Sequence, residues 1–452
     1  MGSITSALLD SSNALDVFSR TFNVIENNIS NVNTPGYAKQ DQLLLAQPFN
    51  PEQHLSGGVA EGPLISSRSE YLEQAVRTQQ QAAGNAGQRA ADLGQIQPLF
   101  DLTATAGVAG NLNAFFNSFS QLSVNPNDTI SRQAVINSAG QLASSIRTTA
   151  SGIAQVSSNV TIQTSDVVSQ INSIAGDIAK INAQYQASSA AQQDAGLDAQ
   201  LHSDLENLSQ LADFSVIKGS GGAVTVALGG QAPLVIGDQA LPISVDPSSN
   251  QTTITDANGN DVTSEITGGK LGALIQEKNT TIPGYTGDLN TFAQSLADAV
   301  NGQLAQGVDQ NGNTPSTPLF SYDPASAAST LNVNNLTPDQ IAAAASGAAG
   351  GNGNALALAQ LATTPQVNGF TFTQFFGDLG SRIGSDVAAA QQDQQQAQDQ
   401  LTQAQSQRSA VSGVSLNEEA TKLLQYQQAY QAVGKLVSVL DELTQSTMDM
   451  IR

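Results

Sequence analysis

The sequence predicts a mainly α-helical protein that carries a small β-rich domain, and three observations lead to this class. Apolar residues recur at alternating steps of four and three at both ends of the 452-residue chain and again in its middle, which is typical of coiled-coil helices. Between residues 213 and 270 the pattern changes to short β-like runs separated by Gly, Pro and Asn-Gly. We therefore expect an elongated, nested, multi-domain chain with a paired N- and C-terminal coiled-coil stem, a helical bundle and an outer β insert.

The first predicted helix covers residues 3–30 and carries an apolar stripe. The stripe consists of Ile4, Leu8, Ser11, Leu15, Phe18, Phe22, Ile25 and Ile29. The helix ends in Asn31-Val32-Asn33-Thr34-Pro35-Gly36, where polar residues and a Pro-Gly turn interrupt the pattern. Residues 37–65 then show short extended runs broken by prolines and glycines, which predict strands.

Helical spacing returns between residues 69 and 122, with an interruption expected near Gly107 and Gly110. The strongest central stripe begins at Ile146, reaches Tyr185 and continues weakly to about Leu211. This stripe predicts a long coiled-coil helix in the middle of the chain.

The segment after the β-like runs is predicted to be helical from residue 270 to 304, past a break at Pro283-Gly284. Residues 307–354 are rich in Gly, Pro, Asn and Ala and predict long loops with short strands. A further helix is expected from about Ala355 to the break at Ser412-Gly413.

The last predicted helix has a stripe that matches the N-terminal one. It consists of Leu423, Tyr426, Tyr430, Val433, Val437, Leu440, Thr444, Thr447 and Ile451. We expect the two ends to pair as a stem. Because a single helix pair leaves half of each helix exposed, our hypothesis is that the ends are loose in the monomer and become ordered on polymerisation.

The patterns divide the chain into three nested parts. We expect the terminal stem at residues 1–60 and 413–452. The helical bundle is expected at 61–212, 271–306 and 355–412, and the β-rich outer domain at 213–270 with 307–354.

The composition excludes several classes of function. A formal net charge of -22 argues against nucleic acid and against anionic membrane surfaces. No apolar run approaches the ~20 residues of a membrane-spanning helix, so no membrane insertion is expected. The chain has no cysteine, which excludes disulfides and thiolate chemistry. The first positive side chain is Arg20, so we expect no conventional secretory signal and either a cytoplasmic location or export by a dedicated machine.

The residues that carry catalysis or bind metals are sparse. The two histidines, His54 and His202, are both expected on the surface, and two histidines without cysteine make a zinc site or a Ser-His-Asp triad improbable. Glu418-Glu419 is the best candidate for a paired-acid glycosidase. It falls in the first turn of the last helix, however, where negative charge stabilises the helix dipole.

Two stretches resemble calcium-binding loops. The stretch that begins at Asp309 lacks the glycine that a calcium loop needs at its sixth position, and Phe320 stands where the bidentate glutamate belongs. Residues 256–261 fit a hairpin turn better, because Asn-Gly readily adopts positive φ. No phosphate-binding glycine loop is present. We therefore predict that the protein has no catalytic residue, no cofactor and no bound metal, and that it is not an enzyme.

The two ends carry recognisable motifs. The segment Asn27-Asn28-Ile29-Ser30-Asn31-Val32-Asn33-Thr34-Pro35-Gly36-Tyr37-Ala38-Lys39-Gln40 resembles the N-terminal signature of the axial proteins of the bacterial flagellum, which are the rod, hook and hook-associated proteins. Residues 412–419 together with 424–432 resemble the C-terminal signature of the same family. The matching positions are Asn28, Ser30, Asn31, Thr34, Pro35, Gly36, Tyr37, Gly413, Val414, Leu416, Glu418, Glu419, Gln427 and Tyr430.

The form of residues 414–419 and the chain length are most similar to the hook-associated members. This resemblance implies a structural subunit at the hook–filament junction, exported without a cleaved signal peptide by the flagellar type III apparatus and located outside the cell in the flagellum. The implied partners are further copies of the chain, the hook protein FlgE, the second junction protein FlgL and the export chaperone FlgN. Alternatives are a hook or other axial subunit, or a secreted adhesin or enzyme built on an axial stem.

The resemblance also implies an assembly surface on the terminal helices. Its residues would be Ile4, Leu8, Leu15, Phe18, Phe22, Ile25, Ile29, Tyr430, Val433, Val437, Leu440 and Ile451. Alternatively, these residues hold the stem together within a single subunit.

Overall fold

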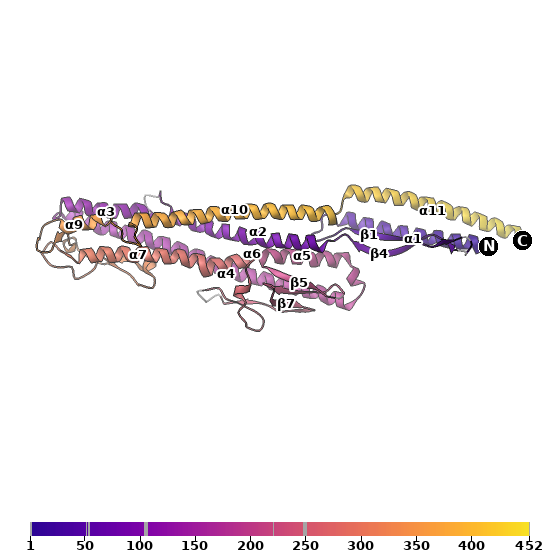
Figure 1. Cartoon of the computed structure of the whole chain (residues 1–452), viewed down its shortest axis with the longest axis horizontal. Helices are drawn as coiled ribbons and strands as arrows, with labels where there is room; N and C mark the ends of the chain where they lie inside the picture. The colour runs from indigo at the N-terminus through magenta and orange to yellow at the C-terminus, as the bar shows by residue number, and fades with distance from the viewer. Residues whose placement is uncertain are drawn as a thin grey trace. The chain divides into compact units, whose positions relative to one another are not determined.

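The computed structural model describes residues 2–50, 52, 55–103, 107–219, 221–246 and 251–451. The chain forms two compact units. The first unit comprises Met1–Ala83, Gln170–Ile243 and Ala397–Arg452, and the second comprises Gly84–Ser169 and Ser244–Gln396. Long helices dominate both units, and the sheets are small (Figure 1). The predicted class, mainly α with a small amount of β structure and long terminal helices, is confirmed.

The first unit contains both terminal helices. Its complete elements are α1 (Gly2–Ser30), β1 (Gln40–Ala46), β2 (Phe49–Asn50), β3 (Leu55–Ser56), β4 (Val59–Ser66), η3 (Ala191–Gln193), α5 (Ala195–Leu211), β5 (Phe214–Lys218), β6 (Val224–Leu228), β7 (Ala232–Ile236), β8 (Gln239–Ala240) and α11 (Leu416–Ile451). Three long helices belong in part to each unit: α2 (Glu70–Ile96), α4 (Thr129–Ala187) and α10 (Phe372–Ser412).

The N-terminal helix α1 packs beside α11, and both ends of the chain lie at the same end of this pair (Figure 1). Strands β1 and β4 form an antiparallel hairpin that packs on α1. Its register runs from Gln40 opposite Ser66 to Ala46 opposite Val59, with a bulge between Gln42 and Leu44. The predicted first helix and the extended runs that follow it are therefore confirmed.

The sheet of the first unit is antiparallel with the order β5-β6-β7-β8. On β6, Val224, Val226 and Leu228 are buried and alternate with half-buried residues, which is the period-two pattern of a strand with one covered face. Asn182 of α4 joins the helix to this sheet. Its Nδ2 donates to the carbonyls of Val224 and Gly237, at 2.7 Å each, and its Oδ1 accepts from the Val224 N–H at 2.8 Å.

The second unit is a helical bundle with small two-stranded sheets. Its complete elements are η2 (Gln97–Phe100), α3 (Val108–Val124), β9 (Ser244–Val245), β10 (Ile254–Thr255), η4 (Thr263–Glu265), α6 (Gly269–Gln276), the π-helical turn η5 (Glu277–Thr281), α7 (Ile282–Leu304), β11 (Gly307–Val308), β12 (Phe320–Ser321), α8 (Ala327–Thr330), β13 (Asn332–Val333), η6 (Pro338–Gln340), β14 (Ala344–Ala345) and α9 (Gly353–Gln360). Strands pair antiparallel as β9–β10, β11–β14 and β12–β13.

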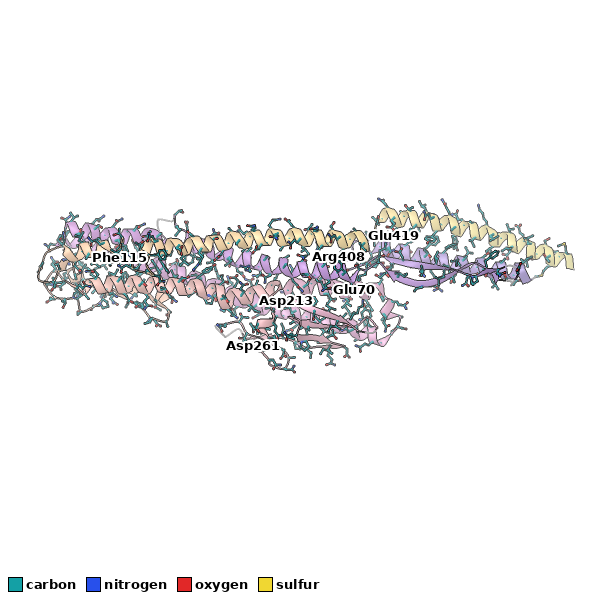
Figure 2. The ribbon with its side chains drawn as sticks, in the orientation of Figure 1. Glu70, Phe115, Asp213, Asp261, Arg408 and Glu419 are labelled. Atoms are coloured by element: carbon teal, nitrogen blue, oxygen red, sulfur yellow. The ribbon has the colours of Figure 1, made fainter. Side chains whose placement is uncertain are left out.

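An aromatic cluster forms part of the core of the second unit. Phe115 of α3, labelled in Figure 2, contacts Phe116, Phe119 and Phe320 with ring centroids 5.2–5.7 Å apart. Phe292 of α7 extends the cluster to rings of α10. Phenylalanines of α3, α7, α10 and β12 thus meet in this core, and aromatic pairs add to the energy of area burial there.

Three predictions along the chain are wrong in detail. The central stripe does not continue as one helix to Leu211, because α4 ends at Ala187 and Asp194 caps a new helix by accepting from the N–H groups of Gly196 and Leu197. Pro283 does not end its helix: it lies in the first turn of α7, directly after the π-helical turn, where a missing N–H is tolerated. The helix expected from about Ala355 to Ser412 is instead two helices, α9 and α10, because residues 361–371 are not helical. The interruption expected near Gly107 is confirmed, since α3 begins directly after it, although Gly110 lies within α3.

Candidate assembly interface

The helices α1 and α11 meet along their predicted stripes. Phe18 packs against Tyr426 and Phe22 against Tyr430, with ring centroids 6.0 and 5.9 Å apart. Of the predicted interface residues, Ile25 is buried and Tyr430 is 39 % exposed. The side chain of Ile451 lies outside the described residues. The others are half-buried, namely Ile4, Leu8, Leu15, Phe18, Phe22, Ile29, Val433, Val437 and Leu440.

The most buried face of α1 shares only Ser11 and Ile25 with the predicted stripe. It consists of Ser11, Ala14, Val17, Thr21, Ile25 and Asn28. This face contains small and polar residues because α1 packs against both α11 and the hairpin of β1 and β4. The Thr21 hydroxyl donates to the Val17 carbonyl at 2.9 Å, so its burial leaves no unmet donor. A hydrophobic stripe alone therefore identifies only part of the packed surface.

The two family signatures meet at Asn28. Its Nδ2 donates to the carbonyl of Gln40 at 2.8 Å and to Oε2 of Glu419 at 3.0 Å, and its Oδ1 accepts from the Gln40 N–H at 3.0 Å. Asn28 and Glu419 are 1 % and 0 % exposed. Figure 2 shows Glu419 near the start of α11, next to the hairpin. Residues 391 positions apart in sequence thus share a buried hydrogen bond, which costs stability if either partner is removed.

A group of charged residues surrounds this bond. Nζ of Lys422 lies 2.6 Å from Oδ1 of Asp41 and 3.5 Å from Oε1 of Glu419. Partial burial lowers the pKa of Lys422, but the hydrogen bond and charge of Asp41, and then the charges of Glu419 and Glu418, outweigh it and raise the pKa above its ordinary value. The hydrogen bond from Lys39 to Glu418, at 3.2 Å, lowers the pKa of that exposed carboxyl.

The predicted role of Glu418-Glu419 is therefore incomplete. Both residues do lie in the first turn of α11, as expected for charges that stabilise a helix N-terminus. Glu419 in addition turns inward and pairs with the N-terminal signature. The sequence gives no signal of this pairing beyond the presence of an Asn in one motif and a Glu in the other.

The N-terminal signature forms a compact polar turn. Asn31 Nδ2 donates to the Asn27 carbonyl at 2.9 Å, and the Thr34 hydroxyl donates to Asn31 Oδ1 at 2.9 Å. The Tyr37 hydroxyl lies 2.9 Å from both Asn27 Oδ1 and Asn28 Oδ1. Burial, and then the charge of Glu419, raise the pKa of Tyr37 to about 12. These side chains fix the course of the chain from α1 into β1.

Two glycines of the signatures are required by close contacts. Gly36 has φ of +72°, and a Cβ there would lie 2.1 Å from the carbonyl oxygen of Ala199 in α5. A Cβ on Gly413 would lie 2.4 Å from the Ser409 carbonyl oxygen. Next to it, the Ser412 carbonyl accepts from the Lys39 N–H at 2.9 Å. The remaining signature residues Ser30, Pro35, Leu416 and Gln427 are exposed, and Val414 is half-buried.

A buried ionic cluster next to the signatures was missed by sequence reasoning. Arg68 donates to Glu73, with N and O 2.7 Å apart, and to the Gly36 carbonyl at 2.6 Å. Arg408, labelled in Figure 2, lies 2.7 Å from Glu206 and 3.2 Å from Glu73. In the sequence Arg408 is only one residue of the helix expected before Ser412-Gly413, whereas in the structure its charge joins α10 to α2 and α5.

The prediction of a surface histidine is wrong for His202, which is 5 % exposed. Burial, and then the charges of Arg68, Arg77, Lys218 and Arg408, lower the pKa of His202 to about 2. It is buried because it lies on the inward face of α5, with Leu201 and Leu205. The second histidine, His54, lies outside the described residues.

Two apolar surfaces of the first unit remain uncovered. On α11, Leu436, Val439 and Leu443 are 50–51 % exposed and follow steps of three and four. They form a second stripe, which we call the outer stripe, on a face that differs from the one that meets α1. On the hairpin and the adjoining strand β2, four apolar side chains are 40–72 % exposed, namely Leu43, Leu45, Phe49 and Ile65. The regular spacing of the outer stripe was readable in the sequence, but only the structure shows that α1 leaves it open.

The loops that resemble calcium sites are stabilised by their own backbone. Asp256 Oδ1 accepts from the N–H groups of Asn258 and Asn260, at 2.8 Å each. Asp309 Oδ1 does the same for Asn311 and Asn313. The predicted turn at residues 256–261 is confirmed, with Thr255 bridged to Asp261. Across the described ranges, no cluster of three or more His, Asp or Glu side chains has a metal-binding arrangement.

The signatures and the fold can be compared with known proteins. A family model described as the flagellar hook-associated protein FlgK helical domain matches residues 93–320, which is half of the chain. The chain belongs to the FlgK family. A second model, described as the C-terminal part of the flagellar basal body rod FlgEFG proteins, matches residues 405–450 and so covers the C-terminal signature. The FlgK family is a structural family of the flagellum and not a family of enzymes.

Relatives with established names support this assignment. Flagellar hook-associated protein 1 of Bacillus subtilis is 26 % identical over 95 % of this chain and 95 % of its own length. The protein of the same name from Salmonella typhimurium is 27 % identical over 66 % of this chain, which spans 56 % of that relative's length. The structure of the flagellar hook junction protein FlgK from Burkholderia pseudomallei superposes with a TM-score of 0.68 at 18 % identity, over 75 % of this chain and all of that one. The resemblance to hook-associated proteins is thus confirmed.

Within the described residues, no helix combines the length and hydropathy that a membrane-spanning segment requires.

Proposed function

We propose that this FlgK-family chain is a structural subunit at the junction between the flagellar hook and filament, and that it polymerises through its terminal helices. The uncovered outer stripe of α11 carries this proposal. Leu436, Val439 and Leu443 are half exposed although their spacing is that of a coiled-coil seam. A second helical neighbour would bury these side chains, and each fully buried leucine or valine stabilises by about 1.5–3 kcal/mol.

The interface on the terminal helices would have two parts. The predicted residues, such as Phe22, Val437 and Leu440, lie where α1 meets α11 and would position the two helices. The outer stripe and the apolar face of the hairpin would contact neighbouring copies. This division favours a role of the predicted residues within one subunit, with assembly contacts on the adjacent face.

A pair of substitutions tests this division. Val439→Asp places a charge in the outer stripe and should block polymerisation while α1 and α11 stay paired. Leu440→Asp places a charge on the stripe of α11 that faces α1, and it should disrupt the pairing of α1 with α11 as well as assembly. Gln431→Asp, also at an exposed position of α11, is the matched control for added charge. Assembly is measured by sedimentation and motility, and pairing by circular dichroism. Normal assembly by Val439→Asp would refute the role of the outer stripe.

The position in the flagellum would be at the junction, because the relatives that match this chain are named hook-associated protein 1. The neighbours would be the hook protein FlgE and the second junction protein FlgL. Electron microscopy of cells that lack the gene tests this. Hooks without filaments, with flagellin lost to the medium, are the expected result. Missing hooks would instead favour a hook or rod subunit, and intact filaments would contradict an axial role.

Export would use the flagellar type III apparatus without cleavage of a signal peptide, and the subunit would act outside the cell. The chaperone FlgN would cover α11 before export, because that helix carries two apolar stripes and only one is covered by α1. Chaperone binding should therefore be lost in a chain cut at residue 412. Retained binding would place the chaperone site elsewhere.

The nested domain plan also remains a proposal. A stem at 1–60 and 413–452, a helical bundle at 61–212, 271–306 and 355–412, and a β-rich domain at 213–270 with 307–354 would place assembly contacts in the stem. Limited proteolysis should cut first at these boundaries.

A further inference from the structure

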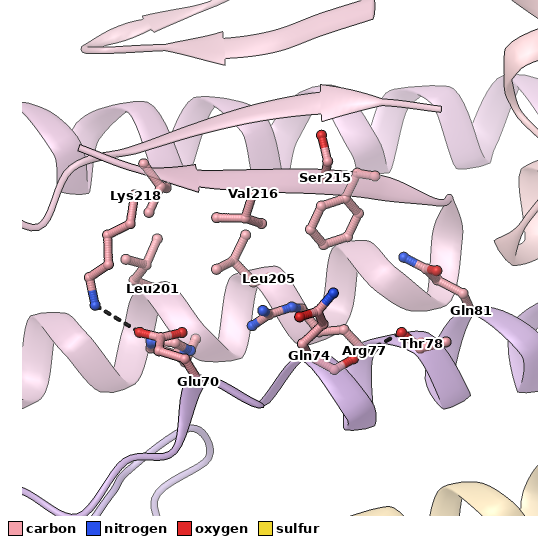
Figure 3. A pocket seen from close by; sticks show the side chains of 13 residues that line it. Glu70, Gln74, Arg77, Thr78, Gln81, Leu201, Leu205, Ser215, Val216 and Lys218 are labelled. Carbon is pink, nitrogen blue, oxygen red and sulfur yellow. Dashed lines mark hydrogen bonds and ion pairs between the residues drawn. The ribbon is translucent and has the colours of Figure 1, made fainter. Parts of the chain in front are cut away.

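A cleft in the first unit lies between α2, α5 and the edge strand β5. It has a volume of about 390 Å³, which is within the range of roughly 300–1,000 Å³ of small-ligand sites. Figure 3 shows Leu201 and Leu205 of α5 facing Val216 of β5, with Gln74 and Arg77 of α2 beside them. One wall of the cleft is therefore aliphatic and another is polar.

The charged side chains around the cleft are paired, with one exception. Lys218 forms an ion pair with Glu70 at 2.8 Å, shown by a dashed line in Figure 3. Arg68 and Arg408 both pair with Glu73. Arg77 lines the same cleft, yet within the described part of the chain it has no hydrogen bond and no ion pair within 4 Å. This half-buried guanidinium group feels the charges of Glu73 and Glu70, but neither carboxylate lies within ion-pair distance, so its five donors are open to a ligand.

The buried imidazole of His202 is a second unmatched polar group at the cleft. It is among the lining side chains and is 5 % exposed. Its Nδ1 has no hydrogen-bond partner among the residues that the structure describes. Burial and the nearby cations keep the imidazole neutral. A neutral imidazole offers one donor and one acceptor, so it suits a polar ligand group and not a further cation.

These features restrict the chemistry of an occupant. A single unpaired arginine matches one negative charge, and its planar fork matches a carboxylate. The aliphatic wall of Leu201, Leu205 and Val216 requires an apolar body next to that charge. A polyanion is disfavoured as the occupant, because it would lie near the carboxylate of Glu70. Among the lining residues that are described, it would also find no cation besides Arg77 that is not already paired.

We infer that this cleft binds a small amphipathic monocarboxylate, with its carboxylate on Arg77 and its hydrocarbon body against Leu201, Leu205 and Val216. The site is independent of the proposed role in the flagellum, because none of its lining residues belongs to the terminal helices or to the hairpin.

The test uses the full chain with sodium octanoate as the probe and octanol as its uncharged analogue. Titration is followed by calorimetry and by NMR of the Arg77 side-chain N–H. Octanoate should bind saturably and shift this resonance. Arg77→Gln should weaken octanoate binding by about tenfold or more, because Arg–carboxylate hydrogen bonds are about twice as strong as neutral ones. Octanol binding should be unaffected by the substitution.

The matched control is Arg20→Gln, which removes a cation of α1 that is already paired with Asp16 and Glu61. It should leave octanoate affinity unchanged. Circular dichroism checks that both variants fold. If Arg77→Gln does not fold, the titration of the wild-type protein still tests the inference. Octanoate must then shift only the NMR resonances of residues that line the cleft. No saturable binding, shifts elsewhere, or equal affinity in Arg77→Gln and wild type would overturn the inference.

Discussion

The hydrogen bond between Asn28 and Glu419 predicts a sharp effect of a nearly isosteric substitution. Asn28→Asp keeps the shape of the side chain but replaces the Nδ2 donor with an oxygen. The carbonyl of Gln40 and Oε2 of Glu419, now 2.8 and 3.0 Å from that donor, would both lose it. Each buried acceptor left unmet costs about 1–3 kcal/mol, so the pairing of α1 with α11 should weaken by roughly 2–6 kcal/mol. Repulsion between the two carboxylates adds to this loss.

Amide hydrogen exchange of α1 and α11 measures this loss locally. A whole-chain unfolding curve is less suitable, because a chain with two units does not unfold in two states. Opening of both helices should become at least about thirtyfold more frequent, which corresponds to about 2 kcal/mol. Asn27→Asp is the matched control. Asn27 is exposed, and its Oδ1 only accepts hydrogen bonds, from Asn31 and Tyr37, which an aspartate retains.

Glu419→Gln completes a double-mutant cycle. In the Asn28→Asp background, a glutamine at 419 supplies the amide donor that the pair lacks, so part of the loss should be recovered. The coupling energy should reach about 0.5–3 kcal/mol. Exchange in Asn28→Asp that equals that of Asn27→Asp, or strictly additive effects of the two substitutions, would refute the reasoning.

Three further predictions concern other positions. Gly36→Ala should destabilise the first unit several times more than Gly434→Ala, because the new Cβ meets the Ala199 backbone at 2.1 Å while that on Gly434 meets nothing within 4 Å. Equal changes in amide hydrogen exchange of α1 and α5 would contradict this. Folding lowers the pKa of His202 to about 2. The unfolded chain therefore binds a proton at His202 more readily than the folded chain, and the first unit should lose stability as pH falls below about 6.5. His202→Gln should flatten that dependence in hydrogen exchange of α5, and an unchanged slope would count against it. Burial, and then the charge of Asp92, raise the pKa of Glu277 to about 7, so the second unit should instead gain stability as pH falls from about 7 toward 4.5. At pH 8, Glu277→Gln should therefore stabilise the second unit on the order of 3 kcal/mol, at about 1.36 kcal/mol per unit of pKa. Faster amide hydrogen exchange of η5 in this variant at pH 8 would contradict the prediction.

The pH predictions for the two units have opposite signs, although both follow from burial. Removing solvent disfavours the charged form of each group. For His202 the charged form is the protonated one, and for Glu277 it is the deprotonated one. Acidification therefore opposes folding of the first unit at His202 and favours folding of the second at Glu277. Exchange measured separately in α5 and in η5 distinguishes the two.

Much of the helical plan was predictable from the sequence because helix and strand periods are local properties. The α1 stripe through Phe18 and Phe22 and the α11 stripe through Tyr426 face one another, as their common spacing requires. The short β-like runs expected between residues 213 and 270 include the strand that the structure shows at β6. The two signatures indicated the family, but the sequence did not show what structural role the signature residues have.

What the sequence determined by itself is the set of elements, the stripes that pair them and the absence of cysteine chemistry. Only the tertiary structure decided that Glu419 turns inward to Asn28, that His202 is buried, that Arg408 joins three helices and that the outer stripe of α11 stays open. The physical reason is the range of the interactions. Periodicity reports on neighbours within one helix turn, whereas a buried polar side chain is stable only when a partner hundreds of residues away in sequence satisfies it.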